Sequence, residues 1–333
     1  MIVGKPLVSV IVACRNEARW IRETINSVLA QTYSDLELVV VDDGSTDNTA
    51  AIVASIPDPR LRLIRQAPAG ACAARNAGLR LATGDLIQML DGDDLLAADK
   101  IEHQVDRWRE LGDSYVYFGP FARFSRRPGQ KGIRPQPNWT DMDGHAWLVS
   151  TWTNGDMMAP HAWLTPAALV RAAGPWNESL QQNQDGDYFS RVLLASAGVR
   201  YCPQALSYYR VGVKHSISVR NDRPARSSRL YATRMIARRL LAQDSSQEVR
   251  YACANAYEEQ MLLNWVEHPD LAAEARMEMD ALGGSDGRQP FRSDQFRWSA
   301  KLLGWRLACQ IQQRMRRLRE GTLVGAHGDP LSE

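Results

Sequence analysis

Short apolar runs alternate with amphipathic stretches over the first 112 residues. The strand-like runs cover 8–13, which is rich in β-branched residues, 36–41, 61–65 and 86–90, and helical periodicity fills 19–31, 70–82 and 97–111. Continuous apolar strands that alternate with amphipathic helices are typical of a parallel sheet covered on both faces. The pattern therefore predicts an α/β fold, with a mostly parallel sheet flanked by helices.

The pattern changes twice farther along the chain. From 113 to 219, aromatic strands alternate with long polar loops, and Pro and Gly punctuate 126–137, which predicts a loop there. Helical periodicity returns at 227–243, 248–267 and 271–282, before a break rich in Gly, Ser and Asp at 283–287. We therefore expect one domain over 1–219, with halves 1–112 and 113–219, and a helical extension over 220–333.

Two acidic clusters follow predicted strands. Asp42-Asp43-Gly44-Ser45 follows the second strand, and Asp91-Gly92-Asp93-Asp94 follows the fourth. Ligands of open α/β sheets bind outside the carboxyl ends of the strands, so both clusters should share one rim. Crowded carboxylates repel one another unless a cation or a helix N-terminus lies among them. A Mg²⁺ or Mn²⁺ bound by Asp91 and Asp93 together with diphosphate oxygens would relieve that repulsion.

A simpler interpretation of the polar clusters is local helix capping. Asp94 is placed to cap the helix that follows it, and Ser45 or Thr46 to start the helix after the second strand. Asn16 is likewise placed to cap the first helix. Capping explains the first cluster as well as a nucleotide contact does, but it leaves the other two aspartates of the second cluster unexplained.

Composition and charge add few constraints. The 333 residues carry 40 basic and 38 acidic side chains, a formal net charge of +2, so no polyanionic partner is indicated. Five scattered cysteines without a C-x-x-C pair suit reduced thiols in a cytoplasmic protein. A strand pattern begins almost at the first residue, and no run of about 18 apolar residues occurs, so we expect neither a signal peptide nor a membrane-spanning helix.

Several enzyme classes are disfavoured because their motifs are absent from the sequence. There is no G-x-G-x-x-G after the first strand and no G-x-x-x-x-G-K-[ST], which argues against dinucleotide dehydrogenases and P-loop enzymes. The six histidines show no zinc-ligand spacing, and no G-x-S-x-G elbow is present, which argues against zinc hydrolases and serine hydrolases.

Five motifs over residues 6–100 resemble those of the family 2 glycosyltransferases in their order and spacing. They are Val8-Ser9-Val10-Ile11-Val12-Ala13, Arg15-Asn16-Glu17, Val41-Asp42-Asp43-Gly44-Ser45-Thr46-Asp47, Ala74-Arg75-Asn76-Ala77-Gly78 and Leu90-Asp91-Gly92-Asp93-Asp94. The resemblance extends more loosely to about residue 218 and does not cover the last third. It implies the GT-A fold, in which 1–112 is the nucleotide-binding half and 113–219 the acceptor half.

The resemblance also implies roles for particular residues toward a nucleotide-sugar donor. The residues implied at the donor site are Ala13, Arg15 and Glu17 in the loop around the base, Asp42 on the base ring, Arg75 near the donor, and Asp91, Gly92 and Asp93 of the D-x-D motif. Within that motif Asp91 would face the ribose. Asp93 would hold the metal that binds the diphosphate.

The segment around residue 185 resembles the part of the family that carries the catalytic base. Trp176-Asn177-Glu178-Ser179-Leu180 precedes Gln184-Asp185-Gly186-Asp187-Tyr188, where Gln184 stands in place of the usual glutamate. Asp185 then matches the aspartate that deprotonates the acceptor, and Asp187 is the alternative base. Both could instead be a cap and a first-turn acid of the helix at 188–195.

Farther along, the resemblance places Arg210 and His215 in a segment that closes over the pyrophosphate, with His215 as a further metal or phosphate contact. Trp152, His161 and Trp163 precede this segment, on the expected acceptor side. Aromatic faces suit stacking on sugar rings, but aromatic side chains are also ordinary core material, and both interpretations remain open.

The segment 297–319 carries seven basic residues and no acidic one, with apolar residues at helical spacing. Such a composition suits a helix on an anionic membrane surface, and it equally suits a basic helix that packs its apolar side on the domain. We therefore expect a cytoplasmic protein with peripheral membrane contact as one alternative.

Together these features predict a metal-dependent, inverting transfer of a sugar from a UDP- or dTDP-sugar to a hydroxyl acceptor, with a GDP-sugar as an alternative donor. The expected acceptor is a surface-glycan or lipid-linked saccharide, and no nucleic acid partner is expected. Two other functions fit a related fold. A nucleotidyltransferase that makes sugar nucleotides would need a Gly- and Arg/Lys-rich loop after the first strand, which is absent. A non-catalytic nucleotide- or glycan-binding protein would be consistent with Gln184.

Overall fold

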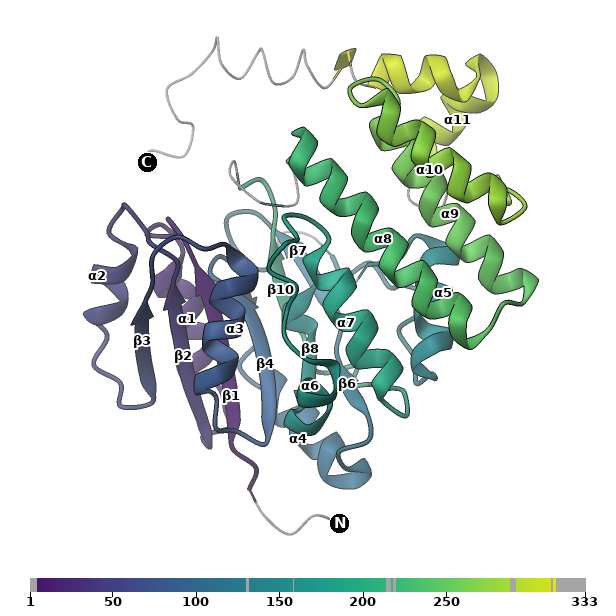
Figure 1. The fold of residues 1–333 in the computed structure, drawn as a ribbon. Helices are drawn as coiled ribbons and strands as arrows, with labels where there is room; N and C mark the ends of the chain where they lie inside the picture. The colour runs from purple at the N-terminus through teal and green to yellow at the C-terminus, as the bar shows by residue number, and fades with distance from the viewer. Residues whose placement is uncertain are drawn as a thin grey trace. The chain divides into compact units, whose positions relative to one another are not determined.

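The computed structural model describes residues 5–129, 132–157, 159–213, 217, 220–287, 292–312 and 314–315 (Figure 1). The strands are β1 (Val8–Cys14), β2 (Leu36–Asp42), β3 (Leu61–Arg65), β4 (Leu86–Asp91), β5 (Leu95–Leu96), β6 (Val116–Phe118), β7 (Phe121–Phe124), β8 (Trp163–Pro166), β9 (Val199–Tyr201) and β10 (Ser207–Arg210). The helices are α1 (Ile21–Leu29), α2 (Thr49–Ala54), α3 (Ala71–Leu81), α4 (Lys100–Leu111), α5 (Gly144–Asn154), the 3₁₀ turn η1 (Pro160–Ala162), α6 (Ala167–Ala173), α7 (Gln184–Ala195), α8 (Arg223–Gln243), α9 (Gln247–Asn264), α10 (Pro269–Ala281) and α11 (Asp294–Leu303).

A seven-stranded sheet in the order β3-β2-β1-β4-β8-β6-β9 forms the centre of the fold. The strands β3, β2, β1 and β4 are parallel, β8 is antiparallel to both β4 and β6, and β6 is parallel to β9. A second sheet of three strands has the order β5-β10-β7. The predicted α/β fold with a mostly parallel sheet is therefore confirmed.

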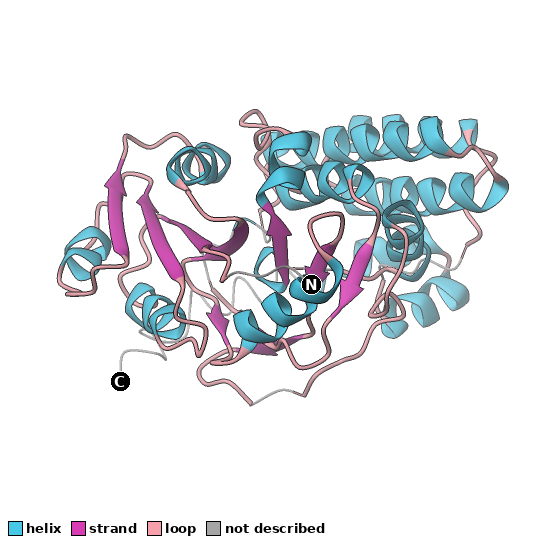
Figure 2. Ribbon diagram, turned by 90° about the horizontal axis from the view of Figure 1, so that it is seen from below, coloured by secondary structure: helices cyan, strands magenta, loops and turns pink. Residues whose placement is uncertain are grey.

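The continuous apolar runs of β1 and β2 are explained by helices on both faces of the large sheet (Figure 2). On one face, α1 and α4 pack against alternate residues of β1 and β2 in a large hydrophobic cluster. On the other face, Ala74 and Ala77 of α3 pack against Val39 and Val41. Because successive side chains of a strand point to opposite faces, a strand covered on both sides is apolar at nearly every position, and the polar exceptions Ser9 and Glu37 bond to each other.

Three predicted helix caps are wrong. Helices α1, α2 and α4 each begin several residues after the residue expected to cap them. Asn16, Ser45, Thr46 and Asp94 therefore lie in the loops before these helices. Asn16 bonds instead with Ser45 and Thr46 in the neighbouring loop, and Asp94 with Arg210 of β10 and His161 of η1, at the edge of the sheet described below.

The chain divides into two compact units. The first contains residues 1–151 and 156–240, and the second contains 152–155 and 241–333. Most of α8 thus belongs to the unit that holds the sheet, although the sequence pattern suggested a boundary near 219. The second unit is helical, and Arg292 pairs with Glu259 of α9 within it at 3.0 Å. Among the described residues, no helix is long and apolar enough to cross a membrane.

Candidate active site

The carboxyl ends of β1, β2 and β4 meet at one edge of the large sheet. Strand β1 pairs with β2 so that Cys14 lies opposite Asp42, and with β4 so that Ala13 lies opposite Asp91. In a parallel sheet this register puts the residues that follow the three strands on one rim. The structure thus brings together the two acidic clusters and the loop after β1, as the sequence predicts.

The loop after β1 is tied to the loop after β2. Asn16 has a φ of 57°, its N–H donates to Ser45 Oγ at 2.9 Å, and its Oδ1 accepts from the Thr46 N–H at 2.8 Å. A non-glycine residue in this left-handed region persists only where its surroundings fix it. The bonds that replace the predicted cap therefore hold the expected nucleotide-base loop in shape, while Arg15 remains exposed.

The two aspartates at the end of β2 have different roles in the structure. Asp42 is fully buried, and its Oδ1 accepts from the Ser45 N–H at 3.2 Å. Its Oδ2 has no hydrogen-bond partner in the described part of the chain, and Arg65 Nε lies 3.6 Å away. Asp43 accepts three hydrogen bonds from the loop 66–70 before α3. Asp42 thus has one carboxylate oxygen that is buried beside Arg65 without a hydrogen bond to a described residue, whereas Asp43 holds the loop before α3.

The D-x-D turn packs closely on the loop after β1. A Cβ at Gly92 would lie 2.8 Å from Cys14 Cβ and 3.1 Å from Glu17 Cγ, so only glycine allows this approach. Burial, followed by the charge of three neighbouring carboxylates, raises the pKa of Asp93 to about 9. Burial and neighbouring carboxylates likewise raise the pKa of Glu17 to about 7. The turn is therefore a cluster of mutually repelling acids.

These acids fit a divalent cation. A bound cation favours the ionised form of carboxylates that otherwise raise one another's pKa, and oxygen ligands suit Mg²⁺ or Mn²⁺. Within the described ranges no three His, Cys, Asp or Glu side chains are arranged to hold a metal by themselves. Asp93 and Asp91 therefore fit an ion that completes its shell from substrate oxygens. The third predicted ligand, His215, lies outside the described residues.

Asp94 belongs to a chain of buried polar groups that runs from the core to the D-x-D turn. His161 Nδ1 lies 2.8 Å from Asp94 Oδ2, and the Arg210 N–H donates to Asp94 Oδ1 at 2.7 Å. Gln88 Nε2 donates to the His161 carbonyl at 3.0 Å, and Lys100 Nζ donates to Gln88 Oε1. We call these five residues the polar chain. They fix the turn from its inner side.

Arg210 is also committed to protein partners. Its Nε donates to the Asp93 carbonyl at 2.6 Å, and its Nη2 to Glu23 Oε2 at 2.7 Å. Its guanidinium carbon lies 4.0 Å from the ring centre of Trp20 and 4.3 Å from that of Phe124. In this structure Arg210 therefore orients the backbone of Asp93, and its predicted contact with the pyrophosphate would require the guanidinium to exchange partners.

Arg75 of α3 connects the D-x-D turn to the beginning of α7. Its Nη2 donates to Asp91 Oδ1 at 2.7 Å and its Nη1 to Gln184 Oε1 at 3.0 Å. Its guanidinium carbon lies 4.6 Å from the ring centre of Trp176, and the residue is only 7% exposed. We call this arrangement the Arg75 bridge. Arg75 and Gln184 are 109 residues apart in the sequence, so the Arg75 bridge connects distant parts of the chain.

The two candidate bases of α7 differ in their partners. The helix begins at Gln184, which puts Asp185 and Asp187 in its first turn. Asp187 is buried and pairs with Arg191 at 3.2 Å and Arg239 at 2.9 Å. Asp185 forms no ion pair with the described residues, and burial raises its pKa while Arg75 opposes the shift. The contacts thus favour Asp185 over Asp187 as a group that can exchange a proton.

Comparison of the sequence with known protein families agrees with this geometry. Residues 9–161 match the model described as Glycosyl transferase family 2.

These residues belong to glycosyl transferase family 2.

Relatives share this family 2 segment. The chain is 31% identical over 197 residues to an uncharacterized glycosyltransferase of Rickettsia typhi, a match that covers 58% of this chain and 60% of that protein. It is 41% identical over 112 residues to the UDP-Glc:alpha-D-GlcNAc-diphosphoundecaprenol beta-1,3-glucosyltransferase WfgD of Escherichia coli, covering 33% and 44%. The chain therefore spans less than two thirds of the length of these relatives.

The fold extends beyond the family 2 segment. The crystal structure of S. aureus TarS 1–349 in complex with UDP-GlcNAc matches with a TM-score of 0.69 at 18% identity, covering 92% of this chain and 91% of that one. This likeness confirms the predicted GT-A-type fold together with its helical extension.

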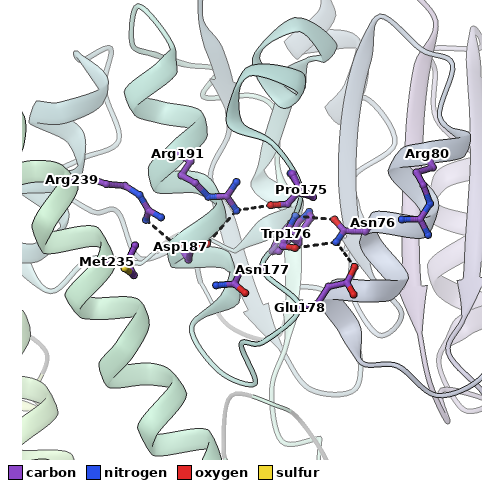
Figure 3. Close-up of a pocket in the computed structure, with 10 residues that line it drawn as sticks. All are labelled: Asn76, Arg80, Pro175, Trp176, Asn177, Glu178, Asp187, Arg191, Met235 and Arg239. Carbon is purple, nitrogen blue, oxygen red and sulfur yellow. Dashed lines mark hydrogen bonds and ion pairs between the residues drawn. The ribbon is translucent and has the colours of Figure 1, made fainter.

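A cavity of about 560 Å³ lies in the first unit, near the first turn of α7 (Figure 3). Side chains of α3, the loop 175–178, α7 and α8 line it. Asn76 closes one side by donating to Glu178 Oε1 at 2.8 Å and to the Trp176 carbonyl at 3.0 Å. The acids that line the cavity are Glu178, bonded to Asn76, and Asp187, paired with two arginines, and none of Asp91, Asp93 and Asp185 lines it, so the cavity is separate from the predicted reaction centre.

Three further residues were predicted on the acceptor side, and the first of them, Trp152 of α5, is half-buried. His161 and Trp163 are fully buried, and Trp163 stacks on Phe189 with ring centres 5.3 Å apart. His161 and Trp163 are therefore core residues and are not available for stacking on a sugar ring. Conversely, the sequence analysis missed Gln88 and Lys100, although a glutamine within the apolar run of β4 was a usable signal, because a buried polar side chain needs a partner.

Proposed function

We propose that this chain is an inverting glycosyltransferase that moves a sugar from a nucleotide-diphosphate donor to a hydroxyl acceptor. The observation that carries the proposal is the Arg75 bridge. It fixes Asp91, at the donor edge of the sheet, relative to the helical turn that contains Asp185. A single displacement needs the donor and the base held together in one geometry, and such positioning can supply several kcal/mol of the barrier reduction.

The donor we propose is a UDP-sugar, with dTDP- and GDP-sugars as alternatives. Asp42 Oδ2 forms no hydrogen bond in the described part of the chain and would accept one from a base N–H on exchanging its ion pair with Arg65, and the loop at 13–17 would surround the base and ribose. TarS was crystallised with UDP-GlcNAc, and the name of the E. coli relative specifies UDP-Glc as its donor. Both support a uridine nucleotide for this chain.

Asp93 and Asp91 are the residues that would hold Mn²⁺ or Mg²⁺ in the proposed enzyme. Such an ion, when bound, neutralises charge on the diphosphate as it leaves. The chain's own contribution is to keep both carboxylates in place, through the Arg75 bridge for Asp91 and through the bond from Arg210 to the Asp93 carbonyl.

Asp185 would act as the general base. Its carboxylate takes the proton of the acceptor hydroxyl while that oxygen bonds to the anomeric carbon, and the bond from this carbon to the diphosphate oxygen breaks with its electron pair. An α-linked donor then gives a β-linked product. The raised pKa of Asp185 makes it a stronger proton acceptor than an exposed aspartate.

For the acceptor we propose a surface-glycan or lipid-linked saccharide. The name of the E. coli relative specifies an acceptor linked to diphosphoundecaprenol. The glutamine at 184 is compatible with turnover, because Gln184 Oε1 accepts from Arg75 and its Nε2 donates to the Leu180 carbonyl at 2.8 Å. A neutral amide thus completes the Arg75 bridge.

Calorimetric titration of UDP, GDP and dTDP, with and without Mn²⁺, tests the donor site on wild type, Asp93→Ala and the exposed control Asp99→Ala. We expect Mn²⁺-dependent binding of UDP that is lost only in Asp93→Ala. A panel of UDP-sugars with wild type and Asp185→Asn then tests transfer. Failure of every nucleotide to bind would refute the donor site, and pyrophosphate release from a nucleoside triphosphate and a sugar phosphate would identify a nucleotidyltransferase instead.

A further inference from the structure

Exposed apolar side chains are concentrated near the end of the described chain. Of the twelve large hydrophobic residues that are exposed among the described residues, six lie within 298–315. We call them the apolar stripe: Trp298 (68% exposed), Leu302 (61%), Leu303 (51%), Leu307 (44%), Ile311 (37%) and Met315 (43%). A cluster of this kind marks an interaction surface, whereas single exposed apolar residues need no explanation.

The apolar stripe is displayed by helices that are anchored on another side. Trp298 and Leu302 lie one turn apart on α11, and Leu307 and Ile311 lie one turn apart in the helical residues 305–312. Phe296, Ala308 and Cys309 of the same segment are buried, and Cys309 Sγ lies 3.9 Å from the Leu262 carbonyl of α9. The segment is therefore packed within the second unit and leaves one face open.

The charges beside the apolar stripe select its partner. Arg297, Lys301, Arg306 and Arg314 are all exposed, and Asp294 is the one acid among the described residues of 292–315. Cations that flank exposed Trp and Leu side chains fit the headgroup region of an anionic bilayer, which offers both phosphate charges and an apolar interior. A second copy of this chain would bring a stripe with the same positive charge, which repels.

We propose that the apolar stripe binds the surface of an anionic lipid bilayer, with the helices lying in the plane of the interface. No described helix can span a membrane, which agrees with binding at the surface. This interaction is separate from the transfer reaction proposed above, and it is measured without donor, metal or acceptor.

Flotation of the full chain with phosphatidylcholine vesicles, with and without phosphatidylglycerol, tests the proposal. Wild type is compared with Trp298→Ser/Leu302→Ser, with Lys301→Gln/Arg314→Gln, and with Tyr231→Ser, an exposed aromatic residue of α8 in the other unit. Each basic residue near an anionic surface contributes about a fivefold gain in partitioning, so the charge variant should bind roughly 25-fold more weakly. The apolar variant should lose flotation, and the Tyr231 variant should bind as wild type does.

Circular dichroism and thermal unfolding establish that each variant is folded before flotation. Wild type that stays at the bottom of the gradient with anionic vesicles would overturn the proposal. Equal flotation with neutral and anionic vesicles would overturn its electrostatic part. Sedimentation that shows lipid-free self-association, abolished by Trp298→Ser/Leu302→Ser, together with no flotation, would assign the apolar stripe to a second copy instead.

Discussion

Replacing Arg75 should separate the donor edge from the helix that contains the proposed base. In Arg75→Met the side chain keeps its bulk but loses the 2.7 Å bond to Asp91 and the 3.0 Å bond to Gln184. A hydrogen bond to a charged group contributes about 1.5–3 kcal/mol and a neutral one about 1 kcal/mol. Because the Asp91 side chain is 31% exposed, water will partly replace its lost partner. We therefore expect the free energy of unfolding to fall by about 2 kcal/mol.

The effect on catalysis should be larger than the effect on stability. Both Asp91 and Gln184 would be free to move by about an ångström, and displacements of that size cost on the order of 100-fold in rate. We expect kcat/KM for sugar transfer to fall by about that factor while the enzyme stays folded at the assay temperature. Arg75→Lys should not restore activity, since one ammonium group cannot bridge two acceptors as the planar guanidinium does.

Arg80→Met provides the control, because Arg80 lies on the same helix but is exposed. The assay is steady-state transfer at saturating donor, with UDP affinity and Tm measured on the same samples. Full activity in Arg75→Lys, or a loss of stability in Arg75→Met without loss of kcat/KM, would refute the positioning role of the Arg75 bridge.

Three further predictions concern single side chains. Asp185→Asn should lower kcat by roughly 100- to 10,000-fold with UDP affinity unchanged in calorimetry, since it removes only the base; retained turnover would exclude Asp185 from that role. In EDTA, the Tm should fall as pH rises from about 4 to 9, because the folded state raises the pKa of Asp93 from 3.8 to about 9 and so retains a proton that the unfolded chain releases. Asp93→Asn should weaken the dependence of Tm on pH. An unchanged slope would show that Asp93 does not cause it. His161→Phe should destabilise the protein by about 3 kcal/mol in denaturant titrations, since it leaves Asp94 buried without its partner, and a change below about 1 kcal/mol would show that the pair is unimportant.

The first half of the fold could be predicted from the sequence because its signals are local. The strands at 8–14, 36–42, 61–65 and 86–91 are mostly apolar, and the amphipathic helices α1, α3 and α4 alternate with them. Between 113 and 219 the strands are three or four residues long, too short for a periodic pattern to be seen. Helix α5 was not predicted either, because its apolar residues do not form a distinct apolar face.

The candidate site was predictable to the extent that it depends on strand ends. The sequence placed Asp42, Asp91 and Asp93 on one rim because parallel strands bring their carboxyl ends together. It could not distinguish a carboxylate with an open oxygen from one that is fully engaged, since those bonds come from distant loops. Asp187 remained the alternative to Asp185 in the sequence, because Arg239 of α8, which binds Asp187 in the structure, is distant along the chain.

The polar chain has a consequence for how mutations in this gene would be interpreted. Lys100 and Gln88 lie inside the protein, and hydrogen bonds connect them through His161 to Asp94 of the D-x-D turn. A hydrophobic replacement at either position would break a relay of bonds whose far end sets the backbone of Asp93. Substitutions that inactivate the protein are therefore expected at residues that contact substrate and also at buried positions such as Gln88 and Lys100, which resemble ordinary core positions.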